Sequence, residues 1–329
     1  MRIQIYSARP HDEHFLGAQF IREGHEVRST AAGLGPDTVD LANGSEAICT
    51  FVNDQLDAGT LSKLHQFGVR LILQRAAGVD NIDLDTARQL GLAVAHAPTY
   101  SPWAVAEHAT ALLLALNRHI AQAWQQVQHC NYLLDGLLGF DLHEKTVLVV
   151  GTGRIGQCFC RIMQGFGCHM LAYDPFVAAD QQMENVEYGE LTALWPRADV
   201  VSLHAPLLPA TRHMVDAQLL LRSKPEMLLV NTGRGALVNT RSLINALAAK
   251  QFGGYAADVY ENEKALFFHD CSKRPHQDPM LDELLSLPNV IMTPHQAFFT
   301  REALQGITLA MTRALAAWQS GQPDSALIC

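Results

Sequence analysis

Three side chains that follow apolar runs could together handle a proton and a carboxylate. Arg234 stands in VNTGRGALV, Glu263 in ADVYENE and His295 in VIMTPHQAF. A histidine can donate a proton to an oxygen that gains charge, and an arginine offers a planar pair of donors that suits a carboxylate. In an open α/β sheet, ligands bind outside the carboxyl ends of the strands. The trio therefore predicts acid–base chemistry on a small acid at such an edge.

A second group of residues predicts a dinucleotide site. Gly151, Gly153 and Gly156 form G-x-G-x-x-G between an apolar run and a segment with helical periodicity. The first glycine permits a tight turn, the second lets the backbone approach a pyrophosphate, and the third lets helix and strand pack closely. The next apolar run ends in Asp174, whose carboxylate suits the ribose hydroxyls and would repel a 2′-phosphate. The cofactor is therefore expected to be NAD.

The elements that must position these residues read as two β/α series. The expected strands are 3–7, 46–52, 69–74 and 92–97 in the first series, and 146–150, 169–174, 199–205, 227–232, 253–259 and 289–293 in the second. A long buried helix is expected over 101–128 and an amphipathic helix over 301–320. We therefore predict an α/β fold of two Rossmann-like, doubly wound parallel-sheet domains with a cleft between them. The substrate domain is expected at 1–100 with 299–329, and the NAD domain at 101–298.

Bulk composition narrows the class of partner. The chain has 329 residues, 48% of them hydrophobic, and a formal net charge of -9 without a run of Lys or Arg. Nucleic acid and membranes are therefore poor partners. The first residues lack the apolar core of a signal peptide, so we expect a cytoplasmic protein. The histidines and cysteines show no metal-ligand spacing, and no metal is expected.

Several motifs, taken together, resemble the D-2-hydroxyacid dehydrogenase family, most closely the fermentative D-lactate dehydrogenases of bacteria. They are FVND, AAGVDNIDL, YSPWAVAEHA, GTGRIG, SLHAPL, NTGRGALV, DVYENE followed by FFHD, and PHQAFFT. The resemblance implies that Arg234 binds the substrate carboxylate and that His295 is the acid/base. Glu263 would favour the charged imidazole and keep the acid loaded near neutral pH.

The same resemblance implies further contacts with cofactor and substrate. Beside the three glycines and Asp174, the cofactor would contact Arg154, Ile155, Ala205, Pro206, Thr232, Gly233 and Asp258. Backbone N–H groups of Ala77, Gly78 and Val79 would hold the substrate carboxylate. The side-chain end of the site would be walled by Phe51, Tyr100, Phe298 and Phe299. Such bulky rings favour a methyl group, and hence pyruvate and D-lactate.

Two alternatives remain open at this stage. Hydroxypyruvate or glyoxylate reductases share the trio, so the trio does not separate them from a pyruvate enzyme. From another class, an NAD(H)-sensing corepressor uses this fold to recruit partners. Family habit also implies a homodimer or homotetramer, paired through the helix near residues 102–128.

Overall fold

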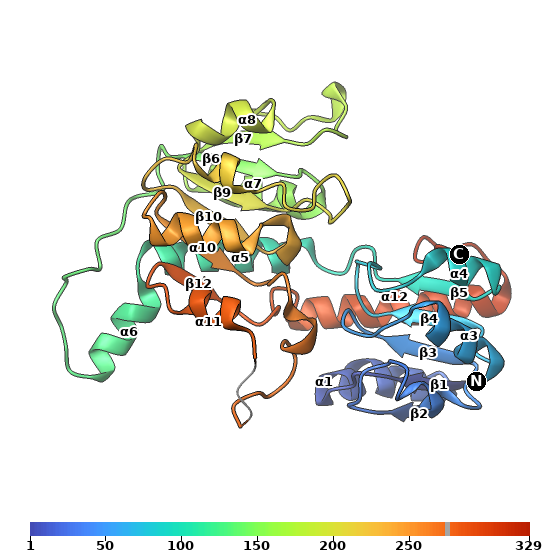
Figure 1. Ribbon diagram of the computed structural model, residues 1–329. Helices are drawn as coiled ribbons and strands as arrows, with labels where there is room; N and C mark the ends of the chain where they lie inside the picture. Colours follow the sequence, from blue (N-terminus) through green and yellow to red (C-terminus); the bar gives the residue numbers. More distant parts are fainter. Residues whose placement is uncertain (274–276) are drawn as a thin grey trace. The chain divides into compact units, whose positions relative to one another are not determined.

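The computed structural model describes residues 1–273 and 277–329, which form two compact units (Figure 1). The first unit comprises Met1–Ser101 and Phe299–Cys329, and the second Pro102–Phe298. Each is built on a sheet whose strand pairs are all parallel. The predicted α/β class with two parallel sheets is confirmed.

The first unit has a five-stranded sheet of order β2-β1-β3-β4-β5. Its strands are β1 (Arg2–Ile5), β2 (Glu26–Ser29), β3 (Ala47–Thr50), β4 (Leu71–Gln74) and β5 (Ala93–His96). Its helices are α1 (Pro10–Asp12), the π-helix η1 (Glu13–Gly17), α2 (Ala18–Arg22), the 3-10 turn η2 (Val39–Ala42), α3 (Ala58–Gln66), α4 (Leu84–Gln89) and α12 (Arg301–Ser320). α12 has the predicted bounds and contacts β4 and β5, which places the end of the chain in this unit.

The second unit has a seven-stranded sheet of order β12-β11-β10-β9-β6-β7-β8. Its strands are β6 (Thr146–Val150), β7 (His169–Tyr173), β8 (Val186–Tyr188), β9 (Val200–Leu203), β10 (Leu228–Asn231), β11 (Gly254–Ala257) and β12 (Val290–Met292). Its α-helices are α5 (Pro102–Asn117), α6 (Ile120–Gln128), α7 (Arg154–Gly165), α8 (Leu191–Leu194), α9 (Ala217–Leu220), α10 (Thr240–Ala248) and α11 (Pro279–Leu285). Short 3-10 turns are η3 (Ala179–Gln181), η4 (Trp195–Arg197), η5 (Gly235–Leu237) and η6 (Glu263–Ala265).

Helices cover both faces of the second sheet, which is why its central strands read as continuous apolar runs. Alternate residues of β6 point to opposite faces: Val147 and Val149 join a core cluster with α5 and α7. Leu148 and Val150 join the other cluster, which includes residues of α9 and α10. The first sheet has its own core, centred on β3, β4 and α3.

Two strands were not predicted. β2 and β8 are edge strands, and their side chains are exposed or half-buried rather than buried. An edge strand that packs weakly needs no apolar run, so the sequence pattern that reveals central strands is missing there. The second sheet therefore has seven described strands instead of the expected six.

The single helix expected over 101–128 is wrong. α5 ends at Asn117 and α6 begins at Ile120, because His119 adopts a left-handed backbone with φ of 50°. α5 is largely buried, whereas α6 and the chain that follows it stand away from the sheet (Figure 1). Throughout the described residues, no helix has both the length and the apolar content needed to cross a membrane.

Candidate active site

The predicted residues of the second unit gather at one edge of its sheet. Arg234 follows β10, Glu263 follows β11 and His295 follows β12, and these three strands are neighbours in the sheet. The glycine loop follows β6, and Asp174 follows β7. All strands run parallel, so all these loops lie at the carboxyl edge, where open α/β sheets bind ligands.

His295 and Glu263 lie within hydrogen-bonding distance of each other. The Nδ1 atom of His295 lies 2.7 Å from Oε1 of Glu263, and both side chains are largely covered, with 16% and 14% exposure. The other carboxylate oxygen of Glu263 accepts a hydrogen bond from the backbone N–H of Tyr260 at 2.9 Å. Because Nδ1 faces the carboxylate, Nε2 is the nitrogen left to exchange a proton with a bound molecule.

Arg234 lies in a turn that is tied to its own strand. Asn231 donates from Nδ2 to the carbonyl oxygen of Arg234 at 3.0 Å, and its Oδ1 accepts from the N–H of Gly233 at 3.1 Å. The guanidinium Nη1 donates to the carbonyl oxygen of Gly233 at 3.0 Å. A Cβ atom at Gly235 would collide with the backbone of Tyr260, so glycine is required where this turn meets the loop after β11.

The glycine loop has the shape that a pyrophosphate needs. Gly151 has φ of 92°, and a Cβ there would lie 2.8 Å from the backbone nitrogen of Ala205. At Gly153 a Cβ would meet nothing within 4 Å, which leaves open space in front of the backbone. Gly156 packs on the carbonyl of Gly151 so closely that a side chain would collide. Gly153 is also the N-cap of α7, whose first N–H groups suit an anion.

Two further side chains fit the rest of a dinucleotide. The Oδ2 atom of Asp174 accepts from the backbone N–H of Thr152 at 2.8 Å, which fixes the carboxylate beside the glycine loop. Thr232 is 8% exposed, and its Oγ1 is one of the few buried oxygens in the described chain that lack a hydrogen-bond partner. An unpaired buried hydroxyl is costly unless a bound group satisfies it. The residues present therefore fit NAD.

The other residues expected at the cofactor are spread over the same edge. Arg154 and Ile155 open α7, and Ala205 and Pro206 follow β9. Asp258 directly follows β11 but is fully buried, and its carboxylate is bonded to the loop after β12. Direct contact of each with NAD stays a prediction.

In the first unit, two side chains hold the loop of residues 77–79, which is predicted to bind the substrate carboxylate. His96 Nδ1 lies 2.8 Å from the carbonyl oxygen of Ala77, and Gln74 donates from Nε2 to the carbonyl oxygen of Gly78 at 3.3 Å. The same amide of Gln74 donates to Asn81 Oδ1 at 2.9 Å. The turn that includes Val79 is thus held by side chains of β4, β5 and the loop itself.

The aromatic residues predicted at the substrate belong to different units. Phe51 and Tyr100 are half-buried in the first unit, where Phe299 is 50% exposed and packs edge-on against His11 with ring centres 4.7 Å apart. Phe298 is the last residue of the second unit. A shared wall around a methyl group stays a prediction.

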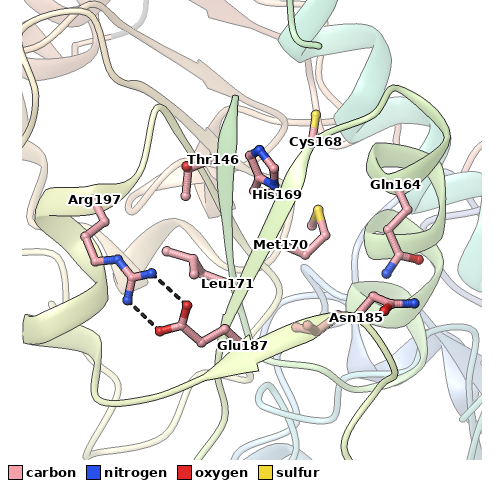
Figure 2. A pocket seen from close by; sticks show the side chains of 10 residues that line it. Thr146, Gln164, Cys168, His169, Met170, Leu171, Asn185, Glu187 and Arg197 are labelled. Carbon is pink, nitrogen blue, oxygen red and sulfur yellow. Dashed lines mark hydrogen bonds and ion pairs between the residues drawn. The ribbon is translucent and has the colours of Figure 1, made fainter. Parts of the chain in front are cut away.

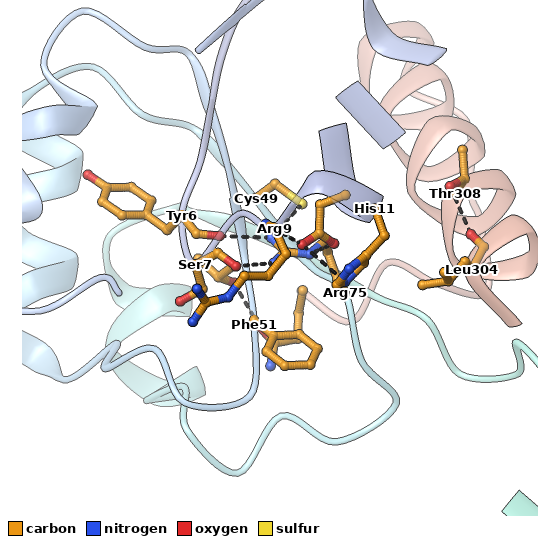
Figure 3. A network of polar contacts seen from close by, with 12 residues as sticks. Tyr6, Ser7, Arg9, His11, Cys49, Phe51, Arg75, Leu304 and Thr308 are labelled. Carbon is orange, nitrogen blue, oxygen red and sulfur yellow. Dashed lines mark hydrogen bonds and ion pairs between the residues drawn. The ribbon is translucent and has the colours of Figure 1, made fainter. Parts of the chain in front are cut away.

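A buried arginine organises the carboxyl edge of the first sheet (Figure 3). Arg75 directly follows β4 and is 3% exposed. It donates from Nη1 to the carbonyl of Tyr6 at 3.0 Å and from Nη2 to that of Ser7 at 3.3 Å, and its Nε lies 3.2 Å from Asp12 Oδ1. Its guanidinium carbon lies 5.3 Å from the ring centre of Phe51. The loop that begins at Ala76 is thereby tied to the ends of β1 and β3.

A groove of about 870 Å³ in the second unit lies elsewhere (Figure 2). Its lining includes Thr146, His169 and Val186, the first residues of β6, β7 and β8. These are the amino ends of the strands, opposite to the edge at which such sheets bind ligands. The ion pair between Glu187 and Arg197 that crosses it is exposed. The groove is therefore separate from the candidate active site.

Four residues that shape the site escaped sequence reasoning: Asn231, Gly235, Thr293 and His108. Thr293 donates from Oγ1 to Asp258 at 2.6 Å, and His108 Nε2 lies 3.0 Å from the same Thr293 oxygen. Asn231 and Gly235 sit within the recognised NTGRGALV motif, so the motif was the available signal. His108 and Thr293 stand in the segments YSPWAVAEHA and VIMTPHQAF, but they are 185 positions apart and no local pattern links them.

Comparison with known proteins supplies the chemical context. Residues 110–297 match the family described as D-isomer specific 2-hydroxyacid dehydrogenase, NAD binding domain. The 2-hydroxyacid dehydrogenase A of Aspergillus oryzae is 48% identical over 316 residues, which cover 94% of this chain and 90% of that protein. The D-lactate dehydrogenase of Escherichia coli is 40% identical over 322 residues, 98% of each chain.

Among solved structures, the pyruvate reductase of Chlamydomonas reinhardtii superimposes with a TM-score of 0.91 at 38% identity, covering 98% of this chain and 97% of that one. These similarities extend over both units, including the parts of the chain that the family match leaves uncovered. The chain therefore belongs to the NAD-dependent D-isomer specific 2-hydroxyacid dehydrogenases.

Proposed function

We propose that the protein is a D-lactate dehydrogenase that reduces pyruvate to D-lactate. The observation that carries the proposal is the 2.7 Å contact between His295 and Glu263, at the carboxyl edge that also bears Arg234 and the glycine loop. A histidine paired with a carboxylate at a nicotinamide-binding edge is the arrangement that protonates a carbonyl oxygen as it is reduced. NADH, when bound, supplies the hydride.

In this proposal, three side chains of the second unit have separate roles in the reaction. Arg234 binds the substrate carboxylate and polarises the carbonyl oxygen beside it, because its planar donors match both oxygens. Protonated His295 delivers its Nε2 proton to that carbonyl oxygen. Glu263 stabilises the imidazolium before the transfer and fixes the ring through Nδ1.

The first unit is proposed to bind the rest of the substrate. N–H groups of residues 77–79 would hold the carboxylate, in a loop that Gln74 and His96 hold in place. Phe51, whose ring is fixed over Arg75, would limit the side-chain end to about a methyl group. The names of D-lactate dehydrogenases among the relatives support this choice, although the 48% identical relative carries a general name.

The decisive experiment compares initial rates of NADH oxidation with pyruvate, hydroxypyruvate, glyoxylate and 2-ketobutyrate, followed by analysis of product chirality. We expect pyruvate to lead in kcat/KM by about tenfold or more. For 2-ketobutyrate, the extra methylene in a tight pocket carries a cost of that order. The product should be D-lactate. A lead for hydroxypyruvate would overturn the substrate while keeping the reaction class. Absence of turnover with all four would favour a cofactor-sensing protein instead.

We further propose that the enzyme is a homo-oligomer whose copies meet through the segment 120–139. Leu134 and Leu138 there are 81% and 91% exposed, and Trp124 is 64% exposed. So many exposed apolar side chains along one segment mark an interaction surface. Light scattering should show a dimer or tetramer, and Leu134→Asp with Leu138→Asp should lower the measured mass. A monomeric parent protein would contradict this proposal.

A further inference from the structure

Asp258 is a buried carboxylate that faces the loop carrying His295. Its exposed fraction is 0%, and it directly follows β11. Its Oδ1 accepts from Thr293 Oγ1 at 2.6 Å and from the backbone N–H of Gln296 at 2.8 Å, and its Oδ2 accepts from the N–H of Ala297 at 2.7 Å. Charge-assisted hydrogen bonds of this kind offset the cost of burying an ion. The carboxylate therefore fastens the loop before and after His295.

The loop holds His295 in an unfavourable backbone conformation. His295 has φ of 57°, in the left-handed region that is unfavourable for a residue with a side chain. Its N–H donates to the carbonyl of Thr293 at 3.0 Å, and the N–H of Thr293 donates to Ala257 at 2.9 Å. Such a conformation persists where the surroundings over-determine it, often at a functional residue. Here the surroundings are supplied chiefly by Asp258.

His108 extends this arrangement to helix α5. Its Nε2 lies 3.0 Å from Thr293 Oγ1 and 3.5 Å from Asp258 Oδ1. The hydroxyl hydrogen of Thr293 is donated to Asp258, so the nitrogen of His108 must donate to the Thr293 oxygen. The chain of contacts thus runs from a buried helix through a hydroxyl and a carboxylate to the backbone of the His295 loop.

We propose that Asp258 is a positioning residue for proton transfer: with Thr293 and His108, it holds the His295 loop so that the imidazole meets Glu263 and presents Nε2. The inference rests on the proposed acid role of His295. It adds a second role to the cofactor contact that family resemblance implies for Asp258. Both carboxylate oxygens are engaged by the loop, and the side chain is completely covered.

The test is the Asp258→Asn variant of the full-length protein, assayed for pyruvate reduction and for NADH binding by fluorescence titration. An amide cannot accept hydrogen bonds at both of its ends, so one backbone N–H of the loop loses its partner. We expect kcat at saturating NADH to fall by about 100-fold, the size of the effect of a misplaced catalytic group. Unchanged kcat at saturating NADH would overturn the proposal, whether NADH binding is weakened or not, because the fluorescence titration separates a loss of cofactor affinity from a loss of turnover.

Milder variants keep the proposal testable if Asp258→Asn fails to fold. Thr293→Val removes the hydroxyl and should lower kcat by about tenfold, whereas Thr293→Ser should restore it. His108→Leu should act in the same direction as Thr293→Val. Equal kcat for Thr293→Val and Thr293→Ser would overturn the proposal.

A parallel His295→Gln variant separates this inference from the proposed function. Loss of turnover in His295→Gln with a fully active Asp258→Asn protein would leave the acid assignment intact and remove the positioning role. Retained turnover in His295→Gln would reject the acid assignment itself.

Discussion

Arg75 in the first unit and Asp258 in the second are both buried charges at the carboxyl edge of a parallel sheet, 3% and 0% exposed. Arg75 lies beside the oppositely charged Asp12. It also donates hydrogen bonds to the backbone carbonyls of Tyr6 and Ser7, which follow β1. Asp258 is held mainly by backbone N–H groups and a hydroxyl. The buried cation of the first sheet is thus neutralised by a carboxylate, whereas the buried carboxylate of the second sheet is stabilised by N–H and O–H dipoles.

Glu263, at the edge of the second sheet, differs from both because it is partly exposed, at 14%, and its partner is a histidine. Its partner is the imidazole of His295, whose Nδ1 lies 2.7 Å from the carboxylate and which is the proton donor of the proposed reaction. Arg75 and Asp12 have no part in the proposed proton transfer, so their contact serves stability and geometry. Asp258 fixes a loop without changing its own state in the proposed reaction. A charge paired with a titratable partner is the arrangement that suits proton transfer.

The largest effect is expected from Arg75→Met. The substitution leaves the carboxylate of Asp12 partly buried without its cation and removes the donors to Tyr6 and Ser7. Removing one member of a buried ion pair costs about 3–5 kcal/mol. We expect chemical denaturation to show a loss of this size in the free energy of unfolding of the first unit, nearly independent of pH around neutrality.

Arg88→Met is the matched control, because Arg88 pairs with Asp85 on the surface and is 52% exposed. Its loss should be about 0.5 kcal/mol or less. Adding Asp12→Asn to Arg75→Met should recover part of the stability, since the stranded charge is then gone. If Arg75→Met and Arg88→Met cost the same, the buried pair has no special structural role and the comparison between the two edges fails.

A second effect is expected from Glu263→Gln. The amide can still accept from Tyr260, but its NH₂ end then faces Nδ1 of His295 and favours the neutral ring. We expect kcat/KM for pyruvate reduction to fall by about 100-fold, because the variant no longer holds the ring through a carboxylate at Nδ1. Steady-state rates with pyruvate check the prediction; a Glu263→Gln protein as active as the parent would remove Glu263 from the proposed mechanism.

Burial and distance along the chain explain which parts of the fold and of the candidate site could be predicted from the sequence. Val147–Val150 and the other central strands are buried on both faces, so their apolar runs were visible, whereas the polar edge strands β2 and β8 were not. The glycine loop and the residues after β10, β11 and β12 were visible as local motifs. The partners that fix them were hidden, because Arg75 contacts Tyr6 and His108 contacts Thr293 across long stretches of chain.

The smallest effect is expected from His204, at the carboxyl edge of the second sheet, where burial favours the neutral imidazole. It follows β9, its Nε2 lies 2.9 Å from Ser202 Oγ, and its ring packs near Phe159. Burial lowers the pKa of His204 to about 4. The unfolded chain takes up a proton at this position below its ordinary pKa of about 6.5, while the folded chain resists it. This contribution to stability is therefore complete near neutral pH and is lost as pH falls through the interval between the two values.

His204→Gln keeps a hydrogen-bonding partner for Ser202 and removes the titration. We expect the variant to lose less stability than the parent protein between about pH 7 and pH 5, by roughly 1–2 kcal/mol, in urea denaturation series at both pH values. His169→Gln is the control, because His169 is exposed at the start of β7 and should leave the pH dependence unchanged. If the free energy of unfolding falls equally with pH in the parent and in His204→Gln, the edge of the second sheet accommodates a cation at His204. The contrast with the buried cation Arg75 would then be one of packing rather than of charge.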